Sequence, residues 1–175
     1  MATIIYDTLK EEINKPQDKN TVVHPFDPIS DEFSRILILG TMPSVRSRKA
    51  DFYYSHPRNR FWSVIAECFG QPLPNTIQEK LRLLLANRIA LWDVLAVCEI
   101  CGSDDSSIRK PVYNDIAAFV SGKTIEKILC NGKKSYDFCS RLDLTIPVLC
   151  MPSTSPANAA WSTERLTETW KSELM

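Results

Sequence analysis

The sequence predicts an α/β fold in which helices cover both faces of a parallel sheet. Four short runs of aliphatic and β-branched residues recur along the chain, each followed by turn residues and then by a helical pattern. These runs cover residues 35–40, 89–94, 125–130 and 146–150. Alternating strands and helices are typical of a parallel sheet, because right-handed crossovers place the helices on its two faces.

Helical spacing predicts the elements between the strands. The face of the first helix carries Phe61, Trp62, Ile65 and Phe69. Helices are predicted over residues 61–69, 77–85, 112–120, 133–141 and 163–174. Ligands of such sheets bind at the carboxyl ends of the strands, so the loops that begin there should converge on one cleft. These loops begin at Gly40, Asp93, Asn131 and Met151.

The chain has 175 residues and no formal net charge, because 21 basic side chains balance 21 acidic ones. A chain of this length buries about 70% of its unfolded surface, so its core requires neither disulfides nor a structural metal. The sequence lacks the apolar run of about 18 residues that a membrane span requires. It also lacks a signal peptide. We therefore expect a cytoplasmic, monomeric protein without a membrane partner.

The charges are unevenly distributed along the chain. Residues 1–33 carry seven acids and three lysines, a net charge of minus four. Residues 35–60 carry six basic residues and one acid, a net charge of plus five. This asymmetry favours an anionic partner. We expect residues 1–23 to form an acidic N-terminal extension, helical or partly disordered, and residues 24–175 to form one domain.

The six cysteines do not predict a metal or redox centre. Cys68, Cys130 and Cys150 lie in apolar stretches, which is typical of reduced, buried thiols. Cys98 and Cys101 form a close pair, but no second pair and no histidine pair stands at ligand spacing. A thiol oxidoreductase that uses Cys98 and Cys101 is therefore the weaker of the alternative functions.

The loop after the first strand concentrates residues that can contact nucleic acid. It reads GTMPSVRSR over residues 40–48 and FYYSHPRNRFW over residues 52–62. The turn exposes backbone N–H groups, the tyrosines offer stacking planes and the arginines offer phosphate contacts. Each residue also has a structural explanation, since Pro57 can start a helix that Ser55 or His56 caps. Their concentration at one strand end favours a nucleic-acid site.

Two later loops add polar groups to the same edge. Residues 151–159 read MPSTSPANA, and two prolines stiffen these small residues so that they can enter a groove with little loss of entropy. An ordinary turn before a helix capped by Ser162 or Thr163 explains the same residues. The segment NGKKS at 131–135 lacks the first glycine of a phosphate-binding P-loop. Its two lysines near a helix start still suit a backbone phosphate.

Four motifs together resemble the uracil-DNA glycosylase superfamily, and most closely its hypoxanthine-DNA (deoxyinosine) glycosylase branch. The motifs are GTMPS at 40–44, YYSHPRNRFW at 53–62, LWDVL at 91–95 and PSTSPAN at 152–158. The resemblance covers residues 24–172. It implies a three-layer sandwich around a four-stranded parallel sheet, with residues 24–175 as a glycosylase-like catalytic domain.

The activity implied by the resemblance is removal of a deaminated base from DNA. The enzyme would flip the base out of single- or double-stranded DNA and hydrolyse its N-glycosidic bond, without a metal or an organic cofactor. Hypoxanthine is the expected base, and uracil and xanthine are further candidates. No lysine within the matched motifs suggests a lyase, so we expect a monofunctional glycosylase.

The resemblance also assigns roles to individual residues. Asn59 matches the asparagine held to be catalytic in the hypoxanthine branch, and Tyr54 matches the aromatic residue that stacks on the flipped base. Residues 153–158 match the motif that enters the minor groove. The base-binding residues are predicted to be Thr41, Met42, Tyr54 and Asp93. The DNA-binding residues are predicted to be Arg46, Arg48, Arg58, Lys133, Ser153, Ser155 and Asn158.

Met42 departs from the pattern of the uracil-cleaving relatives. Most of them place an Asp or Asn at this position, where it orients the attacking water. A thioether is a weak acceptor and not a base, so Met42 cannot do this. We expect weak uracil activity and assign the orientation of water to Asn59, whose amide cannot act as a general base near neutral pH. A non-cleaving binder of damaged or single-stranded nucleic acid remains an alternative.

The sequence allows two interpretations of Asp93. It occupies the position where other branches carry an asparagine that reads the base edge. Its carboxylate could accept the N1–H of hypoxanthine, which adenine lacks. A helix cap or an ion pair with an arginine explains the same residue.

Overall fold

Four parallel strands form the central sheet of the computed structural model, which describes residues 21–175. In spatial order they are β3 (Ile89–Asp93), β2 (Ile36–Gly40), β6 (Lys127–Asn131) and β7 (Val148–Met151). The central strands are buried on both faces, which explains their continuous apolar runs. The predicted four-stranded parallel sheet and its four strands are confirmed.

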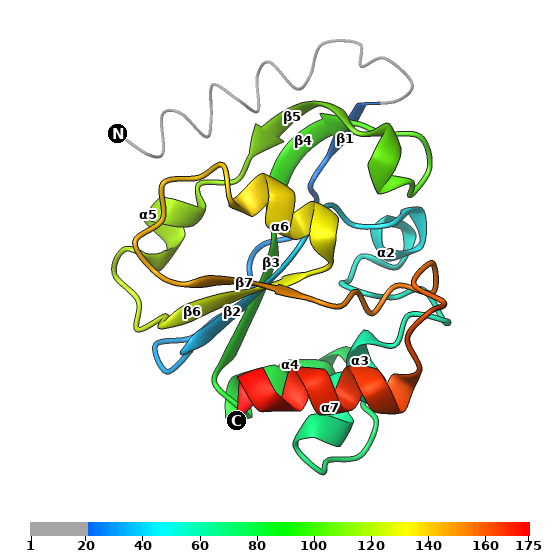
Figure 1. Ribbon diagram of the computed structural model, residues 1–175, viewed down its shortest axis with the longest axis vertical. Coiled ribbons are helices and arrows are strands. Elements are labelled where there is room, and N and C mark those ends of the chain that lie inside the picture. The colour runs from blue at the N-terminus through cyan, green and yellow to red at the C-terminus, as the bar shows by residue number, and fades with distance from the viewer. Residues whose placement is uncertain (1–20) are drawn as a thin grey trace.

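Helices cover both faces of this sheet, as predicted (Figure 1). One layer contains α3 (Phe61–Cys68), α4 (Ile77–Ala86) and α7 (Thr163–Leu174). The other side carries α5 (Ile116–Val120) and α6 (Lys133–Cys139). In α7 the side chains of Leu166, Trp170 and Leu174 share one face and are buried, and Ser162 caps the helix by accepting a hydrogen bond from the Arg165 N–H. None of the helices formed by the described residues has the length and apolar character needed to cross a bilayer.

A second, antiparallel sheet was not predicted. Its strands, in order, are β1 (Thr21–Val23), β4 (Leu95–Glu99) and β5 (Arg109–Tyr113). Val94 alone separates β3 from β4, so the sequence shows one apolar run where the chain leaves one sheet for the other. The bend is held by the Val94 N–H, which donates to the Gly40 carbonyl, and by the Leu95 N–H, which donates to Thr41.

Two helix predictions need correction. The helix predicted over residues 112–120 is wrong at its start, because the apolar pattern joins the end of β5 to α5. The helix begins only after Asp115, whose side chain caps it by accepting from the Ala118 N–H. The basic loop after β2 contains a short helix, α2 (Val45–Ala50), whose cap is Ser44.

The N-terminal extension was predicted to reach residue 23. Residues 21–23 instead form β1, which pairs with β4 and belongs to the folded domain. The remainder of the predicted extension, residues 1–20, lies outside the described residues.

Candidate active site

A cavity of about 720 Å³ opens at the carboxyl ends of the central strands, where the sequence predicted a cleft. The strand ends Gly40, Asp93 and Asn131 reach it. Of the predicted site residues, those that line it are Asn59, Thr41, Met42, Tyr54, Asp93, Arg46, Ser153 and Ser155. The ends of β2, β3 and β6, the α2 region and the loop after β7 therefore meet at one place, although their residues lie far apart in the sequence.

Gly40 allows the polar groups of this cavity to come together. It stands opposite Asp93 in the register of β2 and β3. A Cβ atom at position 40 would lie 2.1 Å from Asp93 Oδ1 and 2.9 Å from the hydroxyl of Tyr54. Any side chain would therefore displace the carboxylate or the phenol, and the GTMPS motif must begin with glycine for this reason.

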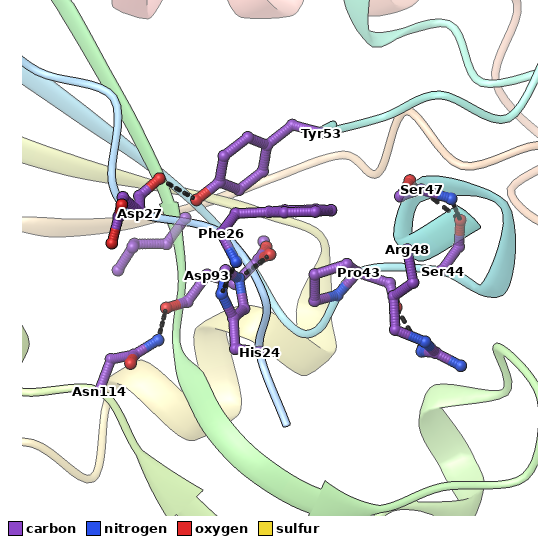
Figure 2. A network of polar contacts seen from close by, with 12 residues as sticks. His24, Phe26, Asp27, Pro43, Ser44, Ser47, Arg48, Tyr53, Asp93 and Asn114 are labelled. Carbon is purple, nitrogen blue, oxygen red and sulfur yellow. Dashed lines mark hydrogen bonds and ion pairs between the residues drawn. The ribbon is translucent and has the colours of Figure 1, made fainter. Parts of the chain in front are cut away.

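Asp93 is held by a histidine that the sequence analysis did not assign to the site. Figure 2 shows His24 directed at Asp93, and its Nε2 atom lies 2.7 Å from Oδ2. Both side chains are buried, with 3% and 5% of their surface exposed. On the backbone of Asp93, the carbonyl accepts a hydrogen bond of 2.9 Å from the Asn114 side chain. The helix-cap and arginine-pair interpretations of Asp93 are wrong, because its carboxylate bonds to histidine.

The hydrogen bonds of His24 define which ring nitrogen carries the proton. Its Nδ1 accepts a hydrogen bond of 3.2 Å from the backbone N–H of Phe26 and is therefore unprotonated. Nε2 then carries the proton and donates it to Asp93 Oδ2. This bond occupies one carboxylate oxygen and leaves Oδ1, next to Gly40, as the acceptor on the cavity side.

Tyr54 lines the cavity and has a left-handed backbone with φ of 50°. One face of its ring stacks on Phe61 at 4.0 Å between centroids, so at most the other face is free to meet a base. Among the described residues its hydroxyl meets no partner at hydrogen-bond geometry. Burial and then the negative charge of Asp93 raise the pKa of Tyr54, against a smaller lowering by Asn131. The phenol is thus a donor at neutral pH. Its stacking on a flipped base stays a prediction.

Asn59 takes part in a chain of directed hydrogen bonds. Its Oδ1 accepts from the Phe61 N–H at 2.9 Å and from the Thr154 hydroxyl at 3.0 Å. The same hydroxyl accepts from Asn131 Nδ2 at 2.9 Å, and Asn131 Oδ1 accepts from the Thr154 N–H at 2.9 Å. Asn59 Nδ2 has no partner among the described residues. The Asn59 NH₂ group is therefore a donor at the cavity and can donate a hydrogen bond to the oxygen of a water molecule. The Asn59 Oδ1 atom is already engaged.

The last loop is fixed in place by Arg60, which the sequence analysis counted only as part of the basic segment. Its guanidinium donates to the carbonyls of Ser155 and Asn158, both at 2.9 Å, and to that of Trp161. Asn158, predicted to bind DNA, donates its side chain to the Ser153 carbonyl at 2.9 Å and braces the loop from within. Ser153 and Ser155 thus reach the cavity from a rigid loop.

The predicted DNA-binding cations divide into two groups. Arg46 lines the cavity, and Arg58 is exposed next to Asn59. Arg48 instead donates to the Pro43 carbonyl at 2.7 Å and thereby holds the turn together. Burial lowers the pKa of its guanidinium. Lys133 pairs with Asp137 at 2.5 Å, which compensates much of its charge. The structure therefore does not bring Arg48, Arg58, Lys133 and Asn158 into the wall of the cavity.

A second carboxyl group in the cavity was missed entirely. Asp105 lies in the connection between β4 and β5, at the start of the short helix η1 (Asp105–Ser107). Burial raises the pKa of Asp105 to about 6, and the charge of Asp93 adds to this effect against a hydrogen bond with Thr41. No sequence pattern marked this residue, because the connection reads as an ordinary polar loop.

The cysteines lie outside this site. Cys98 is buried in β4, and burial raises its thiol pKa to about 11, which makes it a poor nucleophile. Cys101 is exposed just beyond it, and neither residue lines the cavity. Residues 21–175 contain no cluster of three or more His, Cys, Asp or Glu side chains suited to a metal ion.

Comparisons with known proteins identify the family of this chain. Residues 27–174 match the model of the uracil DNA glycosylase superfamily. A "Hypoxanthine DNA glycosylase" of Methanosarcina acetivorans is 34% identical over 146 residues, which cover 82% of this chain and 92% of that protein. A protein of the same name from Methanosarcina barkeri is 34% identical over 115 residues, 65% of this chain and 73% of that protein.

A solved structure shows the same fold. The solution NMR structure of a candidate uracil DNA glycosylase from M. acetivorans superimposes with a TM-score of 0.76 at 32% identity. The match covers 86% of this chain and 95% of the other. The chain therefore belongs to the uracil DNA glycosylase superfamily and is a DNA glycosylase, a hydrolase of N-glycosyl bonds.

Proposed function

We propose that this glycosylase removes hypoxanthine from DNA in preference to other deaminated bases. The observation that carries the proposal is the Asp93 carboxylate, which His24 holds at the end of β3 with Oδ1 toward the cavity. Two relatives that share at least a third of their aligned residues with this chain bear the name hypoxanthine DNA glycosylase, which supports the same substrate.

A fixed carboxylate can distinguish a deaminated base from the normal base it derives from, because the two differ in one ring proton. Adenine presents an unprotonated N1, which a carboxylate repels, whereas hypoxanthine presents an N1–H donor. Cytosine and uracil differ in the same way at N3. A site that binds a substrate N–H can reject the analogue without it strongly, because the buried acceptor is then left unpaired.

Preference for hypoxanthine over guanine follows from base extrusion. Guanine also carries an N1–H, but it is well paired in normal DNA. Extruding a base costs a few kcal/mol and costs least where pairing is poor, as at deoxyinosine mismatches. Stacking on the free face of Tyr54, worth about 1–3 kcal/mol, offsets part of this cost.

The bond cleavage itself is assisted by neutral groups. As the C1′–N9 bond breaks, the sugar becomes oxocarbenium-like and the base gains negative charge. In our proposal, Asn59 Nδ2 holds the attacking water. Because the Met42 thioether in the cavity wall is only a weak hydrogen-bond acceptor, uracil release is expected to be weak.

Release of the free base from defined oligonucleotides tests this proposal. Wild-type protein should release hypoxanthine from deoxyinosine DNA faster than uracil or xanthine from matched strands, and should release no adenine. Salt-sensitive binding to all these strands without release of any base would support the non-cleaving alternative instead.

A further inference from the structure

Asp105 occupies a fixed position in the cavity wall and has no role in the reaction proposed above. The connection between β4 and β5 is tied to α2, because the Val45 N–H donates to Ser103 Oγ at 3.0 Å. Within the connection, the Cys101 N–H donates to Ser107 Oγ at 2.8 Å. The Asp105 side chain faces the cavity and contacts the Thr41 side chain.

The surroundings of Asp105 favour its protonated form. The titratable groups that act on it or feel its charge are Asp93, Tyr54, Cys98, Lys134 and Asp104. Asp93 Oδ2 already receives a hydrogen bond from His24 Nε2. Burial raises the pKa of Asp105 to about 6, so Asp105 holds a proton more readily than an ordinary aspartate and can serve as a donor.

A protonated carboxyl at this position can donate a hydrogen bond to one edge of the purine base. N1, O6 and N7 follow one another along one edge of hypoxanthine, and only N1 carries hydrogen. If Asp93 accepts from N1–H, a neighbouring group along that edge meets O6 and N7, which are both acceptors. A protonated carboxyl is a donor and suits this position, whereas a second carboxylate would be repelled.

We propose, on the basis of the proposed function, that Asp105 is the general acid that protonates N7 of the purine during cleavage. The C1′–N9 bond breaks with its electron pair going to N9, and the Asp105 proton moves to N7, so hypoxanthine leaves as a neutral molecule. Water attacks C1′ and gives up one proton, which restores the Asp105 carboxyl. Pyrimidines have no N7, so this step favours purines.

The experiment compares Asp105→Asn with wild type on deoxyinosine and on 7-deaza-2′-deoxyinosine, in which carbon replaces N7. Single-turnover rates on deoxyinosine should fall about 10²–10⁴-fold in Asp105→Asn, the range of general acid catalysis. On the 7-deaza substrate, the rates of the two proteins should be equal within about threefold. The control Asp143→Asn makes the same change at an exposed carboxyl outside the cavity wall and should behave as wild type on both substrates.

The pH profile gives a second readout, which needs no variant. The wild-type rate on deoxyinosine should fall as pH rises above about 6, where Asp105 loses its proton. The corresponding rate on deoxyuridine should lack this fall.

The possible failures are distinguishable. Wild-type release of hypoxanthine with no loss in Asp105→Asn, or an equal loss on deoxyuridine, overturns the role of Asp105 and leaves the proposed function standing. If wild type releases no hypoxanthine at all, both the proposed function and this role fall. Should Asp105→Asn not fold, a wild-type rate on deoxyinosine that does not change between pH 5 and 8 overturns the role.

Discussion

The two walls of the cavity differ in chemistry although both border the carboxyl ends of the central strands. On one wall, Asn59, Thr154 and Asn131 form a network of amide and hydroxyl groups without charge. On the other, Asp93 and Asp105 place two carboxyl groups in the same cavity, one of them bonded to His24. The neutral wall suits water and sugar, which must be oriented, and the acidic wall suits the base edge, which must be distinguished.

Under the proposed function, the two walls serve different needs, because the acidic wall meets the base and the neutral wall holds the attacking water. Neutral side chains hold a fixed direction through hydrogen bonds at any pH near neutrality. Carboxyl groups respond to pH and to each other. Substitutions on the acidic wall should therefore change substrate choice and pH dependence, while those on the neutral wall should lower the rate on every substrate alike.

Among the substitutions that test the proposed function, Asp93→Asn should have the largest effect, and it tests the acidic wall directly. His24 Nε2–H needs an acceptor, so the new amide should turn its oxygen to His24 and its NH₂ to the cavity. That donor opposes the N1–H of hypoxanthine. We expect release from deoxyinosine to fall about 10²–10³-fold, measured in single-turnover assays.

The same variant also tests discrimination. The ratio of deoxyinosine to deoxyadenosine cleavage should fall along with the rate, because adenine N1 accepts from the new amide. A slower enzyme with an unchanged ratio would show that Asp93 does not read the base.

Asn59→Ala tests the neutral wall. Release should fall about 10²-fold on deoxyinosine and on deoxyuridine alike, because the group that holds the water is lost. DNA affinity, measured by fluorescence anisotropy on a strand with an uncleavable analogue, should stay within about twofold of wild type. Unchanged turnover would remove Asn59 from the mechanism.

Thr154→Val should give a smaller loss, because it affects the neutral wall only through Asn59. Thr154 is fully buried, and valine keeps its shape while removing the hydroxyl that donates to Asn59 Oδ1. We expect about a tenfold loss in kcat with little change in KM, corresponding to one hydrogen bond. Thr154→Ser retains the hydroxyl and should recover most of the rate; equal losses in both variants would indicate a packing effect instead.

The smallest effect expected is on stability, at the acidic wall. The folded-state pKa of Asp105 is raised from 3.8 to about 6, so its stabilising contribution is present below pH 4 and is lost as pH rises through 6. Asp105→Asn should therefore melt about 2 °C or more above wild type at pH 8. At pH 4 the two proteins should melt together, and a difference that does not depend on pH would contradict the assignment.

The parallel sheet was predictable because each buried strand leaves a run of apolar residues. The antiparallel sheet was not, because β4 follows β3 after a single residue and no turn marks the change of direction. β5 was not predicted as a strand for a related reason, since its last residues join the apolar pattern of α5.

The neutral wall of the site was partly predictable and the acidic wall only at Asp93. Asn59 and the last loop lie in dense motifs at strand ends. His24 lies 69 residues from Asp93, in a segment that belongs to none of the four motifs. The contribution of Asp105 depends on the antiparallel sheet that carries it into the cavity, so the same missed element hid this residue.

The most direct test of the central claim is single-turnover release of free base by the wild type from three matched oligonucleotides. One strand carries deoxyinosine, one deoxyadenosine and one deoxyuridine at the same position. The proposed function predicts rapid release of hypoxanthine, slow release of uracil and no release of adenine. Release of uracil at or above the hypoxanthine rate, or of adenine at a comparable rate, would contradict it.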